Sequence, residues 1–225
     1  LYNSYKINRK YKLPYITAKI AISKNKLIYS EGIKRITNQI SDKLSHYLRF
    51  KNDAIMISVK TLNTDNPRLD CRLKGYENFS PIRVILDKNL DIKLNSYILR
   101  SVRSKNTIIF YNSTKDQKLQ VLKKKGAILI KTRLTNQKLF NLKDILKTLF
   151  LMDIRTLLVE GGDKLTKNMI NHRLINEFYL FQGSKILSKS KKHIIFSSFQ
   201  ILNKRYKKLK NTAKLAKDII TIYKR

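Results

Sequence analysis

The sequence predicts an α/β fold in three layers, with a mostly parallel central sheet flanked by helices. Two observations lead to this prediction. Short runs rich in β-branched and other apolar residues recur along the 225 residues, as expected for buried strands. Between them lie segments of about ten residues with helical apolar spacing, and strands alternating with such helices build parallel sheets covered on both faces.

The strands are expected where the apolar runs are densest. Tyr15–Ile22 is the first, because its apolar residues alternate and many are β-branched. The other expected strands are Ala54–Val59, Ile82–Leu86, Thr107–Tyr111, Ala127–Lys131, Thr156–Glu160 and Glu177–Phe181. Asp218–Tyr223 is expected to close the sheet by pairing with the region 206–215.

The helices are expected in the intervening segments. Gln39–Phe50 has apolar residues at helical spacing, namely Ile40, Leu44, Tyr47 and Leu48. A polar helix should end near Lys125, where Gly126 can cap it. Leu142–Met152 and Lys164–Leu174 complete the expected set.

Cysteine and histidine usage argues against disulfide and metal sites. Cys71 is the only cysteine, so no disulfide can form within the chain. The histidines at 46, 172 and 193 match no metal-ligand spacing. No apolar run approaches the roughly 18 residues of a membrane helix, and residues 1–12 lack the apolar stretch of a signal peptide. We expect a cytoplasmic protein with no metal and no membrane partner.

The net charge of +34 resembles that of a nucleic-acid-binding protein. However, 36 of the 49 basic residues are lysine, and lysine, asparagine and isoleucine are the residues that A- and T-rich codons encode. The lysines are also scattered, and arginines and aromatic residues do not visibly alternate on one face. A specific nucleic-acid partner is therefore not expected, although a basic binding protein remains an alternative.

Glu160-Gly161-Gly162 lies where an expected strand becomes a helix. Glycine allows the backbone to approach a ligand closely, and amides at a helix start attract phosphate. The segment is therefore a candidate cradle for a dinucleotide, although a simple tight turn explains it equally well. The Rossmann glycine pattern is absent.

The segment Thr61–Arg72 is the second candidate site, expected as a loop after a strand. It contains a hydroxyl group, a carboxylate and two arginines, and Arg49 ends the preceding helix. Arginine binds phosphate oxygens in a bidentate manner, so the segment suggests a phosphorylated substrate. A surface loop with several charges is the alternative.

These segments, in their order, resemble the reductase domain of the bifunctional riboflavin-biosynthesis deaminase-reductase. The resemblance runs from Pro14 to the C-terminus and is carried by the order of the following segments: Pro14–Ala21, Arg35–Thr37, Leu48–Arg49, Thr61–Arg72, Pro81–Asp87, Leu158–Gly162 and Leu174–Glu177. It implies a dihydrofolate-reductase-like fold, a homodimer, and reduction of 5-amino-6-(5-phosphoribosylamino)uracil by NADPH. Residues 1–13 are then a basic linker from an upstream deaminase domain, and residues 14–225 are the reductase domain. A single cysteine cannot supply the zinc ligands of a deaminase.

The resemblance also implies residue roles. The matched substrate contacts are Arg49, Leu69, Arg72 and Glu160. The matched cofactor contacts are Ala21, Arg35, Thr37, Thr61, Asp65, Gly161, Gly162, Asp163, Lys164, Leu165 and Thr166. We expect proton handling from Lys19, Asp65 or Glu160.

The chain departs from the family pattern at several positions. The usual Ser-Leu-Asp-Gly-Lys turn reads Ser23–Leu27, with asparagine at 25 and no glycine. Ile33 and Arg35 replace a serine and a tryptophan, Lys88 replaces a serine, and Asp163 replaces a third glycine. Arg35 and Lys88 are candidates for binding the extra phosphate of NADPH. These departures leave open a degenerate, non-catalytic domain.

Overall fold

The computed structural model describes residues 2–33, 35–113, 115–189, 191–209 and 213–225. The chain forms two compact units. Unit 1 comprises Leu1–Tyr15 and Arg49–Leu157, and unit 2 comprises Ile16–Leu48 and Leu158–Arg225.

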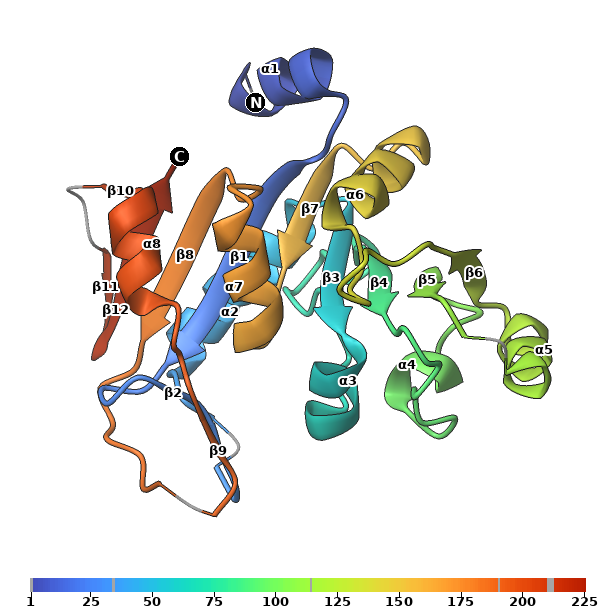
Figure 1. Ribbon diagram of the computed structural model, residues 1–225. Coiled ribbons are helices and arrows are strands. Elements are labelled where there is room, and N and C mark those ends of the chain that lie inside the picture. Colours follow the sequence, from blue (N-terminus) through green and yellow to red (C-terminus); the bar gives the residue numbers. More distant parts are fainter. Residues whose placement is uncertain (1, 34, 114, 190, 210–212) are drawn as a thin grey trace. The chain divides into compact units, whose positions relative to one another are not determined.

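Unit 1 contains four parallel strands in the order β3 (Ala54–Ser58), β4 (Ile82–Leu86), β5 (Thr107–Tyr111) and β6 (Ile128–Lys131). Figure 1 shows them side by side. All five residues of β5 are buried, which explains why the strand appears in the sequence as an unbroken apolar run. The helices of unit 1 are α1 (Tyr2–Tyr11), α3 (Val59–Asp65), α4 (Tyr97–Arg100), α5 (Asp116–Lys125) and α6 (Leu142–Leu151).

Unit 2 is built on β8 (Glu177–Gln182), which pairs in parallel with β1 (Tyr15–Ile22) and antiparallel with β12 (Asp218–Lys224). The strands β10 (Lys207–Lys208) and β11 (Ala213–Leu215) both pair with β12. A separate ribbon joins β2 (Leu27–Ser30) to β9 (His193–Ile195). The helices are α7 (Asp163–Asn171), α8 (Phe199–Arg205) and most of α2 (Gln39–Phe50), and β7 (Thr156–Val159) spans the boundary between the units.

The structure confirms the predicted α/β class with a mostly parallel sheet and flanking helices. The expected strands are present within a residue or two, and the closing strand pairs with the 206–215 region as expected. Gly126 caps α5 in a left-handed conformation with φ of +99°. No helix in the described part of the chain is long and apolar enough to cross a membrane.

Several sequence predictions are wrong in detail. The helix expected over Lys164–Leu174 ends at Asn171, because Arg173 adopts a left-handed φ of +50°. The start of the segment Thr61–Arg72 is helical rather than loop, since α3 extends to Asp65. Residues 2–11 of the segment expected as a linker form helix α1, none of whose described side chains is buried, and the linker role stays a prediction.

The buried face of α2 also differs from the prediction. Its buried residues are Ser41, Ser45 and Leu48. The hydroxyl of Ser41 donates to the buried carboxylate of Asp218 at 2.7 Å. Small polar residues with a buried partner thus replace the apolar stripe that the spacing predicted.

Candidate functional site

In unit 1, the turn that follows α3 is bent at two left-handed positions. Asn66 ends the helix with φ of 42°, and its side-chain oxygen accepts a hydrogen bond from the Tyr97 amide at 2.8 Å. Leu69 follows with φ of 54° and a buried side chain. This geometry anchors the turn in the core, while Arg68 and Arg72 on either side of Leu69 remain about half exposed.

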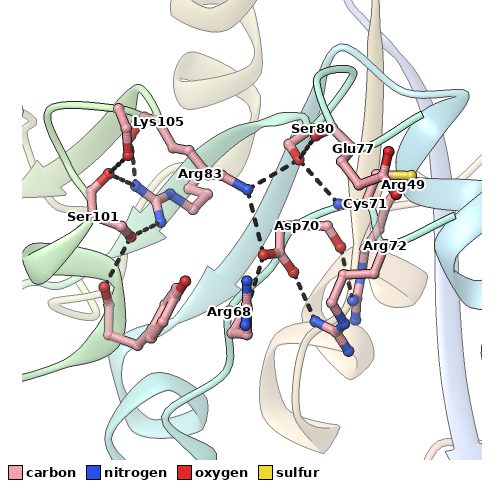
Figure 2. Close-up of polar contacts among 12 residues, drawn as sticks. Arg49, Arg68, Asp70, Cys71, Arg72, Glu77, Ser80, Arg83, Ser101 and Lys105 are labelled. Carbon is pink, nitrogen blue, oxygen red and sulfur yellow. Dashed lines mark hydrogen bonds and ion pairs between the residues drawn. The ribbon is translucent and has the colours of Figure 1, made fainter. Parts of the chain in front are cut away.

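Asp70 is the centre of this turn, and Figure 2 shows the groups that meet at it. Its side chain is 1% exposed. The carboxylate accepts from Arg72 Nη1 at 2.7 Å and from Arg68 Nε at 2.9 Å, and Lys105 Nζ lies 3.3 Å away. The backbone carbonyl of Asp70 accepts from Arg49 Nη1 at 3.3 Å. Burial raises the pKa of Asp70, but the hydrogen bonds from Arg68 and Arg72 and the charge of Lys105 outweigh burial, and the pKa lies below its usual value.

Lys105 is held in place by a second network. Its ammonium also contacts the Ser80 hydroxyl at 3.2 Å. Its backbone carbonyl accepts from the fully buried Arg83, which also donates to the hydroxyl and the carbonyl of Ser101. Burial lowers the pKa of Arg83 to about 10, so the residue remains a cation near neutral pH.

Three aromatic rings of unit 1 form an exposed cluster. Phe50 contacts Tyr76 and Phe79 edge-on, with ring centroids 4.9 and 5.8 Å apart. Phe79 is 60% exposed. Such rings offer flat apolar surface for contact with a planar ring.

The remaining predicted residues of unit 1 differ in their surroundings. The Thr61 hydroxyl lies 3.2 Å from that of Ser58, the residue that caps α3. Asp65 is an exposed residue, yet partial burial of its carboxyl group raises the pKa of that group. Lys88 Nζ donates to the carbonyl of Lys138 at 3.4 Å.

In unit 2, the glycine pair forms a tight entry into α7. Glu160 is half-buried, directly after β7. A Cβ atom at Gly161 would lie 2.8 Å from the Leu165 side chain, so this glycine permits close packing of the helix. Gly162 is the N-cap residue. The side chains of Leu165 and Thr166 are buried, so a ligand at this helix start would meet backbone amides instead.

Asp163 makes structural hydrogen bonds to Ser197 and Ser198. Its carboxylate accepts from the Ser197 amide at 2.9 Å, from the Ser197 hydroxyl at 2.6 Å and from the Ser198 hydroxyl at 3.2 Å. This residue fixes the turn before α8. Lys164, in contrast, is exposed.

Two predicted residues, Lys19 and Ala21, lie in the C-terminal half of β1. Lys19 is half-buried, and its ammonium lies 4.9 Å from the centre of the Phe181 ring on β8. Ala21 is aligned with Phe181 in the parallel register. Both residues point to the same face of the sheet, because they are two positions apart.

Arg35 and Thr37 flank Ile36, whose backbone lies very close to Gly183. A Cβ atom at Gly183 would lie 2.2 Å from the carbonyl oxygen of Ile36, so only glycine fits there. Thr37 is buried. Arg35 is exposed and forms an ion pair with Asp42 at 3.2 Å. A cofactor phosphate would therefore compete with Asp42 for this arginine.

The turn that departs from the family pattern is nevertheless closed. Asn25 accepts from the Ser23 hydroxyl at 2.7 Å and exchanges hydrogen bonds with the backbone of Leu187. Lys26, at the position of the lost glycine, adopts a left-handed φ of 65°. The turn thus persists with a strained residue in the place of glycine.

The predicted residues fall into two groups. Unit 1 holds Arg49, Thr61, Asp65, Leu69, Arg72 and Lys88, and unit 2 holds Lys19, Ala21, Arg35, Thr37 and Glu160–Thr166. The sequence alone gave no role to Asp70 or Lys105, whereas Arg68 was one of the two arginines in the segment expected to bind a phosphorylated substrate. The position of Asp70 between Arg68 and Arg72 was a local signal for an ion-paired cluster. Lys105, in contrast, comes close to Asp70 only through the fold.

Comparisons with known proteins give a consistent result. The family described as the RibD C-terminal domain matches residues 14–221. The riboflavin biosynthesis protein RibD of Aquifex aeolicus is 32% identical over 218 residues, which cover 94% of this chain and 58% of that protein. The 5-amino-6-(5-phosphoribosylamino)uracil reductase of Buchnera aphidicola is 27% identical, over 83% of this chain and 93% of that one.

The structural comparison agrees in fold. RibD of Acinetobacter baumannii superposes with a TM-score of 0.81 at 21% identity, covering 99% of this chain and 60% of that one. The chain thus spans somewhat more than half the length of the RibD proteins that it matches.

Proposed function

The chain belongs to the RibD C-terminal domain family, and from that membership we propose that it reduces 5-amino-6-(5-phosphoribosylamino)uracil to its ribityl form. The arginine cluster on Asp70 carries the proposal, because a phosphorylated substrate needs a built cationic site. The related Buchnera protein, 93% of whose length this chain covers, is named 5-amino-6-(5-phosphoribosylamino)uracil reductase.

The cofactor is proposed to be NADPH. A nicotinamide cofactor supplies a hydride when it is bound. The start of α7 fits its phosphates, since Gly162 caps the helix without a side-chain hydrogen bond and the first amides of the helix have no acceptor within it. Arg35 and Lys88 are the proposed contacts of the extra phosphate, together with cofactor contacts from Ala21, Thr37 and Thr61.

The chain's own residues position the substrate and move a proton. Arg49 and Arg72 bind the substrate phosphate, Leu69 shapes the turn that carries them, and Glu160 contacts the substrate at the strand end. Asp65 has a raised pKa, which favours the protonated acid that opening of the sugar ring requires. Lys19 is the alternative donor.

The proposed assembly rests on the family resemblance, and the proposed location on the cysteine usage and apolar pattern of the sequence. We propose a homodimer in the cytoplasm, with residues 1–13 as a linker and residues 14–225 as the reductase domain.

Turnover of the purified chain tests the function. The chain should oxidise NADPH only when the phosphoribosylaminopyrimidine is present, and NADH should bind more weakly. Glu160→Gln should lower turnover while circular dichroism shows an intact fold. Binding of NADPH without any turnover would instead favour a non-catalytic domain, and equal affinity for both cofactors would contradict the NADPH assignment.

A further inference from the structure

Asp70 connects three arginines through three different atoms. Its two carboxylate oxygens accept from Arg72 and Arg68, and its backbone carbonyl accepts from Arg49. In Figure 2 the three guanidinium groups lie together on one side of the carboxylate, and Lys105 reaches it from the other side. One buried residue thus contacts three arginines and a lysine.

Burial differs sharply within this cluster. The Asp70 side chain is 1% exposed, whereas those of Arg68 and Arg72 are 50% and 46% exposed. The anchor is therefore hidden from a ligand and the cations are not. A surface arginine normally loses side-chain entropy when it binds an anion, and an arginine already held in place loses less.

Arg68 is restrained on a second side as well. Its guanidinium carbon lies 4.8 Å from the centre of the Tyr97 ring. Hydrogen bonding to Asp70 raises the pKa of Arg68. The charge also fits a phosphate monoester, because three guanidinium groups, the Lys105 ammonium and one carboxylate leave three positive charges for a ligand of about −1.5 to −2.

We propose that Arg68 is a third phosphate-binding arginine, and that Asp70 is the positioning residue that holds Arg68 and Arg72 for a phosphate monoester. The inference rests on the proposed function, since it concerns the phosphate of the same substrate. It adds Arg68 and Asp70 to the two arginines, Arg49 and Arg72, that the family resemblance gives as substrate contacts.

Binding of ribose 5-phosphate to the full chain tests the proposal by calorimetry, with ribose as the ligand that lacks the phosphate. Arg68→Ala should raise the dissociation constant for ribose 5-phosphate about 10- to 100-fold, the loss expected for one charge-assisted contact. Arg133→Ala removes an exposed arginine of unit 1 outside the cluster and is the matched control, with a change below about twofold. Equal effects of the two variants would overturn the assignment of Arg68.

Asp70→Asn separates positioning from simple charge. Removing a negative charge near an anion should tighten binding if Asp70 acts only through its charge. If Asp70 positions the arginines, ribose 5-phosphate should bind about 10-fold more weakly, and KM should rise more than kcat falls. Tighter or unchanged binding in a folded variant would overturn the positioning role. If Asp70→Asn does not fold, Arg68→Lys tests the proposal instead. Lysine keeps the positive charge but lacks the planar guanidinium group that can bind Asp70 and a phosphate together. Wild-type affinity for ribose 5-phosphate in that variant would reject the proposal.

Turnover is measured separately from binding. If Arg68 governs ribose 5-phosphate binding but the wild-type chain reduces no substrate, the proposed function fails and this inference stands. If the wild-type chain is active and Arg68→Ala binds ribose 5-phosphate as Arg133→Ala does, the proposed function stands and this inference fails.

Discussion

Buried charges in unit 1 each have a defined set of partners. Asp70 is matched by arginines and a lysine, and Arg83 by the carbonyl groups of Ser101 and Lys105. Asp87 accepts from two backbone amides, at residues 91 and 92, although burial still raises its pKa. A buried charge without partners would cost several kcal/mol, so these residues fix the positions of the loops around them.

Arg72→Ala should impair use of the substrate more than that of the cofactor. The substitution removes a charge-assisted hydrogen bond to phosphate, which is worth about 1.5–3 kcal/mol, so KM should rise roughly 10- to 150-fold. The affinity for NADPH should stay within about twofold. Steady-state kinetics and a cofactor titration measure the two effects, and an unchanged KM would place Arg72 outside the substrate site.

Asp70 should also make stability depend on acid pH. Its pKa is lower in the folded chain than in the unfolded chain, so the ion pairs stabilise the fold fully above the unfolded pKa of about 3.9. That stability is lost as the pH falls through the folded pKa. Urea denaturation below about pH 4 should therefore show a steeper loss of unfolding free energy for the wild type than for Asp70→Asn. Parallel curves would contradict the lowered pKa.

At the scale of elements, left-handed residues mark where helices and turns end. Asn66 ends α3, Gly126 ends α5 and Lys26 closes the turn before β2. A side chain in this conformation costs about 1–2 kcal/mol, and glycine avoids that penalty. The turn at Lys26 thus retains its shape because hydrogen bonds of Asn25 hold it.

Lys26→Gly should stabilise the protein. The glycine relieves the left-handed strain at φ of 65°. Two costs oppose this gain: the larger entropy of glycine in the unfolded chain, and the loss of the lysine contact with the Phe199 ring. The expected net increase in the free energy of unfolding is about 0.5–1 kcal/mol. Lys24→Gly, two residues earlier and not at a position of positive φ, is the control and should destabilise by up to about 1 kcal/mol. Thermal unfolding compares the two variants, and destabilisation by both would show that the turn is not strained at Lys26.

At the scale of the whole molecule, the excess of positive charge is the dominant property. The chain has 49 basic and 15 acidic residues, so acidic partners can neutralise only a minority of the basic side chains. The electrostatic field of the basic side chains that are not neutralised attracts polyanions without selecting a sequence.

Binding of nucleic acid should therefore be weak and strongly dependent on salt. Since only counterion release drives it, the affinity for a short duplex should fall steeply between about 50 and 200 mM salt, without preference for sequence. Fluorescence anisotropy with two unrelated duplexes measures this. Nanomolar, sequence-selective binding at physiological salt would restore the nucleic-acid alternative.

The order of amino acids was sufficient to locate the long strands of the main sheet, the helices α2, α5, α6 and α7 and the two candidate segments, but not helix α1 or the ribbon of β2 and β9. Strands such as β3 and β5 are buried, so their apolar runs are visible without any tertiary information. The short helices α3 and α8 were not predicted, because seven residues carry too little periodicity.

Folding in three dimensions was needed to establish which charges act together. Lys105 meets Asp70 across 35 residues, and Asp163 meets Ser197 across 34. Sequence spacing contains no signal for such pairs, because their distance depends on how the strands between them pair and pack. The local arrangement Arg68-Leu69-Asp70-Cys71-Arg72 was visible, but its function as a buried anchor depends on the left-handed bend at Leu69 that turns Asp70 inward.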